Sequence, residues 1–204
     1  METTEQDVKR RLLLAAKKLF ARQGYDATTI RQICEEAGAN VALVSYHFGG
    51  KERIFEAILE TFFPFDRIQR QFAKVRDPVE GMRLVIREVT LYRSGDPELV
   101  QLIMNESSHD SPRTEAIRKY LIPVWSRMRE LLEQGRREGV FRFRSLDSTF
   151  LYIWGGLLFH REFHLFDPIL AEAPSSLEQL TQDLTDFVLG ALQCGTGSGG
   201  AASG

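Results

Sequence analysis

The placement of prolines and glycines divides this chain into a short first part and a longer second part. All seven prolines follow Phe63, whereas the residues before it are interrupted by Gly24, by Gly38 and by the pair Gly49 and Gly50. Proline disrupts helix interiors, and glycine commonly follows the last residue of a helix. This distribution therefore predicts three helices ahead of Gly50 and a fourth that begins near residue 51.

Hydrophobic residues recur at the helical period along most of the chain. On this criterion the first helix spans residues 8–20, the second opens at a Thr28/Thr29 cap, and the third runs from an Asn40 cap to about Phe48. The same period predicts five more helices, at about residues 79–94, 97–107, 113–138, 147–165 and 175–192.

The predicted fold is therefore all-α, with about nine helices: a helix-turn-helix head of three helices and a larger helical body. Pro123 falls inside the long segment at residues 113–138 and is expected to kink or divide it. The last ten residues, GTGSGGAASG, contain glycines at the spacing of a dinucleotide-binding motif. These glycines follow the last predicted helix and open no further one, so residues 195–204 are predicted to be a disordered tail or a linker.

The composition argues against a disordered chain and against a membrane-spanning one. Of the 204 residues, 43% are hydrophobic, and a chain of this size can bury roughly 70% of its unfolded surface. The longest apolar run, residues 150–159, is much shorter than the roughly 20 residues that a membrane helix needs. No apolar signal peptide is visible, and Cys34 and Cys194 have no metal-ligand spacing. We therefore expect a cytoplasmic protein without a cofactor.

Residues 28–48 are predicted to form a helix-turn-helix. Two short helices joined by a turn at residues 38–40 let the second helix project and enter the major groove of DNA. The predicted outward face of that second helix is small or uncharged, which permits close approach to base edges, thymine methyl groups and phosphates. We expect the DNA contacts to come from Thr28, Thr29, Arg31, Asn40, Val41, Ala42, Leu43, Ser45, Tyr46, His47 and Lys51.

Charge alone gives this interpretation weak support. Residues 1–55 contain nine Lys and Arg against seven Asp and Glu, within a chain whose formal net charge is −2. Mixed charges of this kind are typical of any solvated surface. A three-helix packing unit that does not bind DNA therefore remains an alternative at this point.

Residues 28–52, with the sequence TTIRQICEEAGANVALVSYHFGGKE, strongly resemble the DNA-binding domain of TetR/AcrR-family transcriptional regulators. The similarity also takes in Leu19, Phe20, Gly24, Tyr25, Ile54 and Phe55. Asn40 replaces the serine that often caps the recognition helix in the family, and Ser45 stands where the family often has a tyrosine. The Asn40-Val41-Ala42 start of this helix, followed by residues 46–52, looks like a narrower, CecR-like branch.

The resemblance implies a ligand-responsive transcriptional regulator rather than an enzyme. Residues 1–50 would form the DNA-binding domain, and residues 51–194 the ligand-binding and dimerisation domain, with the helix from residue 51 as connector. A homodimeric repressor would place its two recognition helices in the half-sites of a palindromic operator. Binding of a small apolar or aromatic effector in the second domain would weaken the DNA complex.

The resemblance also assigns dimerisation to the last two predicted helices. The expected interface residues are Tyr152, Leu157, Leu184, Phe187 and Val188. An effector pocket is expected among the middle helices, with the candidate lining residues Tyr92, Met104, His109, Tyr120, Trp125, Phe150 and Trp154. Aromatic and methionine side chains at helical spacing are also typical of an ordinary core, which stays the alternative for both sets.

His160 and His164 have the i, i+4 spacing that can bind zinc on one face of a helix. The metallopeptidase motif needs glutamate directly after the first histidine, but Arg161 stands there and Glu162 follows it. We therefore expect no metal site. A metal-dependent enzyme centred on His160, Glu162 and His164, and a helical dimerisation protein without DNA binding, are the two competing functions.

Overall fold

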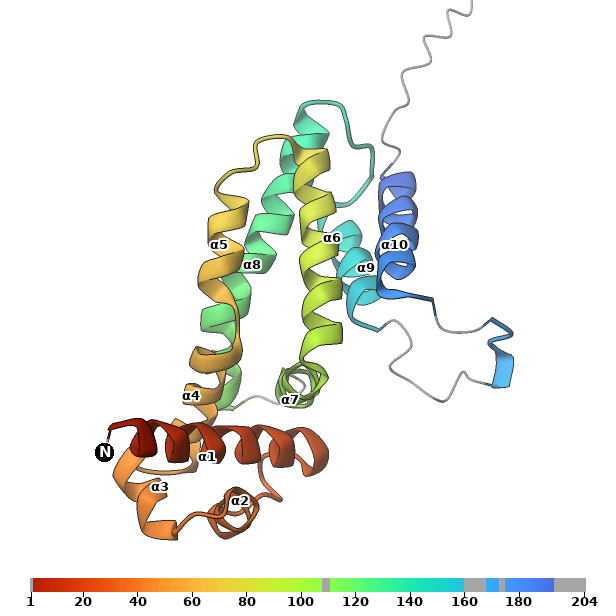
Figure 1. Ribbon diagram of the computed structural model, residues 1–204. Helices are drawn as coiled ribbons and strands as arrows, with labels where there is room; N and C mark the ends of the chain where they lie inside the picture. Colours follow the sequence, from red (N-terminus) through yellow and green to blue (C-terminus); the bar gives the residue numbers. More distant parts are fainter. Residues whose placement is uncertain (1, 108–110, 160–167, 173–174, 193–204) are drawn as a thin grey trace, which may run out of the picture. The chain divides into compact units, whose positions relative to one another are not determined.

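The computed structural model describes residues 2–107, 111–159, 168–172 and 175–192, in which the only regular elements besides one short 3₁₀ turn are ten α-helices (Figure 1). The helices are α1 (Glu2–Gln23), α2 (Ile30–Ala37), α3 (Val41–His47), α4 (Lys51–Phe62), α5 (Phe65–Phe72), α6 (Pro78–Gly95), α7 (Pro97–Ser107), α8 (Pro112–Arg137), α9 (Leu146–Leu158) and α10 (Leu177–Ala191). The predicted all-α architecture is confirmed.

The prediction of about nine helices missed α5. Phe63, with φ −78° and ψ 123°, is extended, as is favoured for a residue before proline. The chain resumes helical geometry directly after Pro64, and α5 buries Ile68 and Phe72. An eight-residue helix gives too few apolar repeats to be recognised beside the longer α4.

α8 continues through Pro123, so this proline does not divide the helix, and the expected kink stays a prediction. Proline removes one backbone hydrogen bond from a helix interior, a cost of about 3 kcal/mol that tertiary packing can offset. Ile117 before it and Val124 and Trp125 after it are all buried. The predicted helix at residues 147–165 corresponds to α9 as far as Leu158, and residues 160–165 lie outside the described part of the chain.

Contacts along the chain define two compact units. The first contains Met1–Arg67 and Asp96–Pro123, and the second contains Ile68–Gly95 and Val124–Gly204. Helices α1–α4 therefore share a unit with α7 and the first half of α8. The predicted domain boundary near residue 50 stays a prediction.

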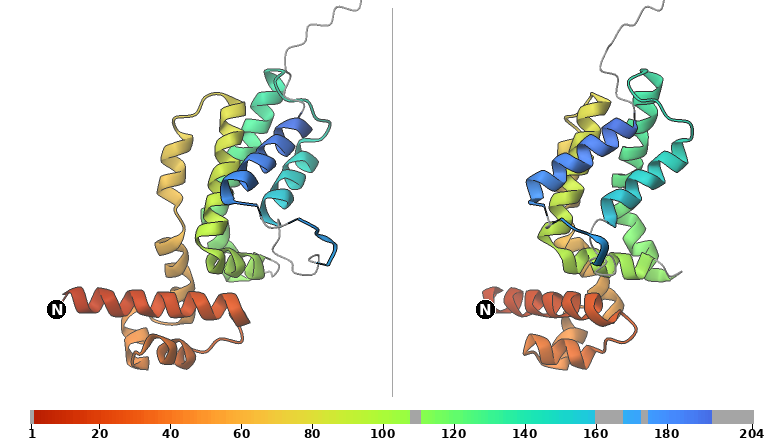
Figure 2. Two further views of the ribbon diagram at one scale, coloured as in Figure 1. Left: turned by 45° about the vertical axis from the view of Figure 1, so that its right-hand side comes forward. Right: turned by 90° about the vertical axis from the view of Figure 1, so that its right-hand side faces the viewer.

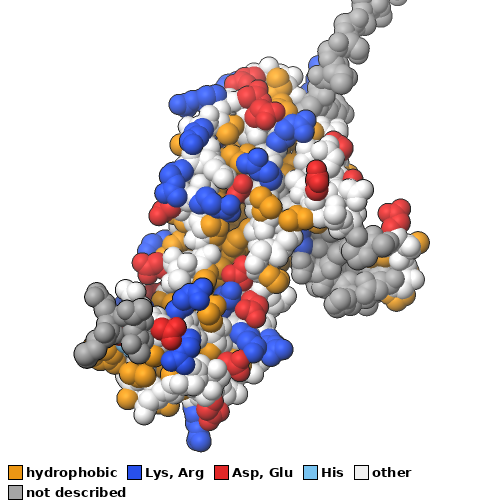
Figure 3. All heavy atoms as spheres, in the orientation of Figure 1, with side chains coloured by type: hydrophobic (Ala, Val, Ile, Leu, Met, Phe, Trp, Pro, Cys, Tyr) orange, Lys and Arg blue, Asp and Glu red, His pale blue; other side chains and the backbone are white. Residues whose placement is uncertain are grey.

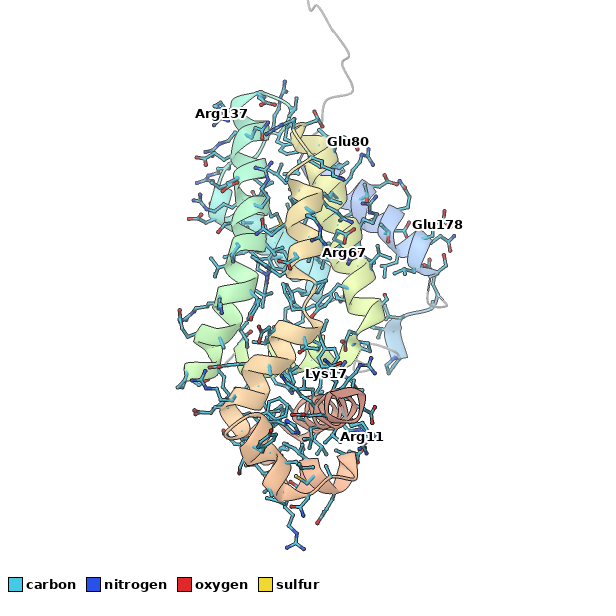
Figure 4. All side chains as sticks on the ribbon, turned by 60° about the vertical axis from the view of Figure 1, so that its left-hand side comes forward. Arg11, Lys17, Arg67, Glu80, Arg137 and Glu178 are labelled. Atoms are coloured by element: carbon cyan, nitrogen blue, oxygen red, sulfur yellow. The ribbon has the colours of Figure 1, made fainter. Side chains whose placement is uncertain are left out.

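In the first unit, α1 packs against α2, α4 and α7. The ring centroid of Tyr25 lies 5.1 Å from that of Phe20 and 5.9 Å from that of Phe55, and these rings form the aromatic centre of the unit. Lys17, labelled in Figure 4, has a side chain that is only 8% exposed, and its Nζ lies 2.7 Å from Asp96 Oδ1. Because Asp96 directly precedes α7, this ion pair attaches α7 to α1.

In the second unit, α6 packs against both α9 and α10, and α9 and α10 also touch each other (Figure 2). Arg93 of α6 is buried and donates a hydrogen bond to the carbonyl oxygen of Leu157 in α9. Leu157 of α9 and Val188 of α10 are buried, at 1% and 3% exposure.

Gly135 of α8 allows a close approach of Phe141, which is 1% exposed. A Cβ atom added at Gly135 would lie 2.0 Å from Phe141 Cδ2. Gly135→Ala is therefore expected to lower the free energy of unfolding by about 1–3 kcal/mol, because the ring must shift within a packed core. Urea unfolding measures this change. The matched control is Gly190→Ala in α10, where an added Cβ atom would have no other atom within 4 Å. The free energy of unfolding of this control should stay equal or rise. Equal losses of stability in both variants would contradict the close packing of Phe141 on Gly135.

Candidate nucleic-acid interface

The first helix of the predicted helix-turn-helix, α2, is fixed at both ends by local hydrogen bonds. Thr29 caps its start in a capping box, in which Thr29 Oγ1 accepts from the Gln32 backbone N–H at 3.2 Å and Gln32 Oε1 accepts from the Thr29 backbone N–H at 2.8 Å. At its end, Gly38 adopts a left-handed conformation with φ 60°, and Arg11 of α1 donates to the carbonyl of Ala37 at 2.9 Å. Arg11 is labelled in Figure 4. The orientation of α2 on α1 is therefore well defined.

A second contact between α1 and α2 is an exposed ion pair, in which Lys18 donates a hydrogen bond to Glu36. This hydrogen bond, together with the charge of Lys18, lowers the pKa of Glu36 below its ordinary value of 4.5. A carboxyl group with a lowered pKa in the folded state contributes stability that is present above its unfolded pKa and lost as the pH falls through its folded pKa.

The ion pair predicts a small loss of stability below about pH 4.5, the value for an unperturbed Glu36. Glu36→Gln keeps the shape of the side chain and should remove this part of the pH dependence, while the rest of the profile stays. Thermal unfolding of both proteins between pH 7 and pH 3 measures the difference. Profiles that run parallel through this range would show that the pair contributes nothing.

The recognition helix α3 follows a three-residue turn and is anchored by apolar residues. Asn40 caps it, because Asn40 Oδ1 accepts from the Ala42 backbone N–H at 2.9 Å. Val44 is fully buried, and Phe48 directly after the helix is 8% exposed. Helices α2 and α3 pack against each other. Because these apolar residues anchor one face of α3, the opposite face of the helix is turned outward.

The outward face of α3 is uncharged. Val41 is 48% exposed and Tyr46 is 74% exposed, and Ala42 and Ser45 are exposed between them. In Figure 3 the surface over α3, at lower left, shows orange and white spheres. Small and hydroxyl-bearing side chains on a projecting helix can approach base edges and phosphates closely.

The helix that precedes α3 carries an exposed cation. The side chain of Arg31 on α2 is 84% exposed, and its Nε lies 3.0 Å from Glu35 Oε1 one turn later. An exposed i, i+4 pair of this kind is weak, so the guanidinium can exchange it for a phosphate.

Three residues of the predicted DNA contact set make contacts within the protein instead. Thr28 is 1% exposed, and its Oγ1 donates to the carbonyl of Gly24 at 2.8 Å. The His47 side chain is 7% exposed, with Nδ1 3.7 Å from Glu5 Oε1. Thr28 and His47 are therefore removed from the expected contact face.

Lys51 is the third correction. Its Nζ donates to the carbonyls of Tyr25 at 2.9 Å and Thr28 at 2.8 Å, and lies 4.1 Å from the centroid of the Tyr25 ring. Burial lowers the pKa of Lys51. The ammonium group closes the turn between α1 and α2 and is not available as a free phosphate ligand. Sequence periodicity cannot reveal such contacts, since they join residues 23 or more positions apart.

The predicted dimer residues divide into two groups in the second unit. Tyr152 of α9 is 78% exposed and Phe187 of α10 is 71% exposed, and Leu151, which lies outside the predicted set, is 57% exposed. Leu157, Leu184 and Val188 are buried within the chain itself, so their assignment to a free interface is corrected. Helical periodicity alone does not tell which of two apolar faces is outward.

The predicted effector residues also divide between the two units. In the second unit, the Trp125 ring lies 6.5 Å from Phe150 and 6.4 Å from Trp154 between centroids, and Tyr92 lies on α6. In the first unit, Tyr120 lies 6.2 Å from Phe63 and also from Phe65, and Met104 lies on α7. His109 lies outside the described residues.

The first unit also has an open groove of about 270 Å³. It is lined by Arg11, Leu14, Ala15, Lys18, Glu36, Ala37 and Glu98. None of the predicted effector residues is among them, so this groove gives no support to the predicted pocket.

Neither a metal centre nor a membrane helix is found in the described part of the chain. Across residues 2–107, 111–159, 168–172 and 175–192, no three His, Cys, Asp or Glu side chains are grouped closely enough to hold a metal ion. His160, Glu162 and His164, the predicted centre of the alternative enzyme, lie outside these ranges. None of the described helices combines the length and the apolar content that a membrane crossing requires.

Two family models match along this chain. The family described as "Bacterial regulatory proteins, tetR family" matches residues 12–58, and "Tetracyclin repressor-like, C-terminal domain" matches residues 78–188. The chain belongs to the TetR family. The predicted family is thereby confirmed for both parts of the chain, while the CecR-like branch stays a prediction.

Individual TetR-family relatives have low sequence identity to this chain, but their alignments cover most of it. The transcriptional regulator LmrA of Bacillus subtilis is 31% identical over 163 residues, which cover 74% of this chain and 85% of LmrA. The transcriptional repressor NicS of Pseudomonas putida is 28% identical over 139 residues, and the chain spans about 64% of the length of NicS.

Two solved structures share the fold. HlyIIR, a hemolysin II transcriptional regulator, has a TM-score of 0.71 at 28% identity, covering 89% of this chain and 99% of HlyIIR. AibR, solved in complex with isovaleryl coenzyme A and operator DNA, has a TM-score of 0.73 at 17% identity, covering 88% of this chain and 97% of AibR. The likeness to AibR shows the fold alone.

Proposed function

We propose that this TetR-family chain is a ligand-responsive, DNA-binding transcriptional regulator, and specifically a homodimeric repressor that a small effector releases from a palindromic operator. The observation that carries the proposal is the exposed, uncharged face of α3 on a helix-turn-helix whose caps fix its orientation. A merely solvated helix would expose charged side chains there. Binding to the chromosome places the protein in the cytoplasm.

The proposed operator contacts follow from exposure and side-chain chemistry. Val41 and Ala42 can contact thymine methyl groups, whereas Ser45, Tyr46 and Arg31 can bond phosphates or base edges. The full proposed set is Thr29, Arg31, Asn40, Val41, Ala42, Leu43, Ser45 and Tyr46. Phosphate contacts give the complex its salt dependence, and base contacts give it sequence preference.

Dimerisation is assigned to the exposed apolar side chains of the last two helices. Leu151, Tyr152 and Phe187 are all more than half exposed, and large apolar side chains of this kind favour burial in a protein interface. The partner is a second copy of the chain, because a palindromic site requires two equivalent heads.

We assign the effector site to the second domain. The proposed effector is a small apolar or aromatic molecule. Trp125, Phe150 and Trp154 supply neighbouring aromatic rings of the type that lines such sites. AibR, with its bound isovaleryl coenzyme A and operator DNA, is a protein of this fold that binds a small molecule. An effector that prefers the DNA-incompetent state about 100-fold supplies about 2.7 kcal/mol of coupling.

Selection from a random pool of DNA duplexes tests the proposal without knowledge of the operator. We expect enrichment of a palindrome whose half-sites are separated by whole turns of the double helix, and an affinity that falls steeply with salt. A chain that enriches no sequence at low salt would instead favour the dimerisation protein without DNA binding.

A further inference from the structure

A buried cluster of charged and aromatic side chains joins α7 and α8 to the turn that precedes α2, within the first unit. Arg113, in the first turn of α8, donates from Nε to Glu106 Oε2 at 2.7 Å. The two side chains are 14% and 7% exposed. Apolar residues of similar volume often stabilise a protein as well as a buried ion pair does, so the presence of this pair is not by itself evidence of a role in stability.

Arg113 reaches beyond Glu106 to the turn between α1 and α2. The guanidinium carbon of Arg113 lies 3.9 Å from the centroid of the Tyr25 ring, and its Nη2 lies 3.6 Å from Asp26 Oδ1. A planar guanidinium over an aromatic ring gains both stacking and cation–π attraction, which a lysine does not reproduce.

The same ring is held by Lys51, whose Nζ lies 4.1 Å from the Tyr25 centroid. Lys51 also donates to the backbone carbonyls of Tyr25 and Thr28, and Thr28 directly precedes the cap of α2. The turn that sets the start of α2 is thus tied to α8 through Arg113 and to α4 through Lys51.

We propose that Arg113 and Glu106 are positioning residues for operator binding: they hold the turn at residues 25–28 and thereby set the orientation of α2 and α3. Neither residue contacts DNA in this account. The inference rests on the proposed function, and it assigns to α7 and α8 a role in the affinity of the head for DNA.

The test replaces the ion pair with a neutral pair of nearly the same shape. The double variant Arg113→Gln with Glu106→Gln avoids an unpaired buried charge, which would cost more than the interaction itself. We expect its affinity for the selected duplex to fall about tenfold, measured by fluorescence anisotropy over a series of salt concentrations. The slope of log affinity against log salt should stay unchanged, because no phosphate contact is lost.

The matched control is Arg118→Gln on the same helix. Its side chain is 55% exposed, and the ion pair that it forms among the described residues is with Glu115 at 3.1 Å, so the affinity should stay at the wild-type value. Amide exchange of DNA-free protein supplies a second measurement, in which the double variant should lose protection over residues 25–30 and the control should not. Arg113→Lys keeps a charge beside Glu106 and loses the planar stacking, so a partial loss of affinity is expected even if the double variant unfolds.

Wild-type affinity in both the double variant and Arg113→Lys would overturn the inference. A salt slope reduced by about one unit would overturn it as well, because Arg113 would then contact a phosphate directly. If the wild-type chain itself enriches no duplex, the proposed function is wrong. If the wild-type chain binds and the variants bind equally well, the proposed function stands and only the role of Arg113 and Glu106 is wrong.

Discussion

Ala42→Glu is expected to reduce operator affinity by at least about 100-fold without unfolding the protein. Ala42 is exposed on the outward face of α3, so the new carboxylate would lie where the account places base edges and phosphates. Repulsion and desolvation of an unpaired charge in that position cost several kcal/mol, and about 2.7 kcal/mol already equals 100-fold. Glutamate in the first turn of a helix is favourable for the helix itself.

Thr61→Glu is the control for this prediction. Thr61 is exposed on α4, outside the proposed contact face. Its replacement by glutamate changes the charge of the protein by the same amount as Ala42→Glu. Anisotropy titrations at one salt concentration should separate the two variants by at least about tenfold, since the control alters only the distant electrostatic field. Equal losses would mean that net charge, and not the face of α3, controls binding.

Phe55→Ala is expected to lower the free energy of unfolding by about 3–5 kcal/mol. Phe55 is fully buried, and its ring centroid lies 6.2 Å from that of Phe20 and 5.9 Å from that of Tyr25. The substitution leaves a cavity in the aromatic centre of the first unit. Domains have about 5–15 kcal/mol of stability in total, so this loss should also weaken DNA binding through partial unfolding.

Tyr46→Ala, in the same unit, is expected to affect DNA contact without affecting the stability of the fold. Tyr46 is 74% exposed, so its removal should change the free energy of unfolding by less than about 0.5 kcal/mol while still reducing operator affinity. Urea titrations followed by circular dichroism measure both variants. A Phe55→Ala protein as stable as the wild type would contradict the packing described for this unit.

Features that depend on local chemistry were predictable from the sequence. Gly38 ends α2 in a left-handed conformation and Asn40 caps α3, as the turn residues indicated. Val44 is buried and Tyr46 is exposed because the period of α3 places them on opposite faces. The all-α fold and the helix-turn-helix follow from such short-range preferences.

Features that depend on distant contacts were not predictable in this way. Lys51 was expected to contact DNA, but it is bound to two carbonyls of the turn before α2. Leu157 and Val188 were expected at a free interface, but they are buried within the chain itself. Arg113 carried no sequence signal at all, because its partners Glu106 and Tyr25 are brought to it only by the fold.

A crystal structure of the chain bound to its selected duplex tests most directly whether the face of α3 reads DNA. We expect two subunits on one palindrome, with Val41, Ala42, Ser45 and Tyr46 of each α3 buried in the major groove and Lys51 still bound to the carbonyls of Tyr25 and Thr28. A complex in which this face of α3 stays exposed to solvent, while another surface of the protein covers the bases, would contradict it.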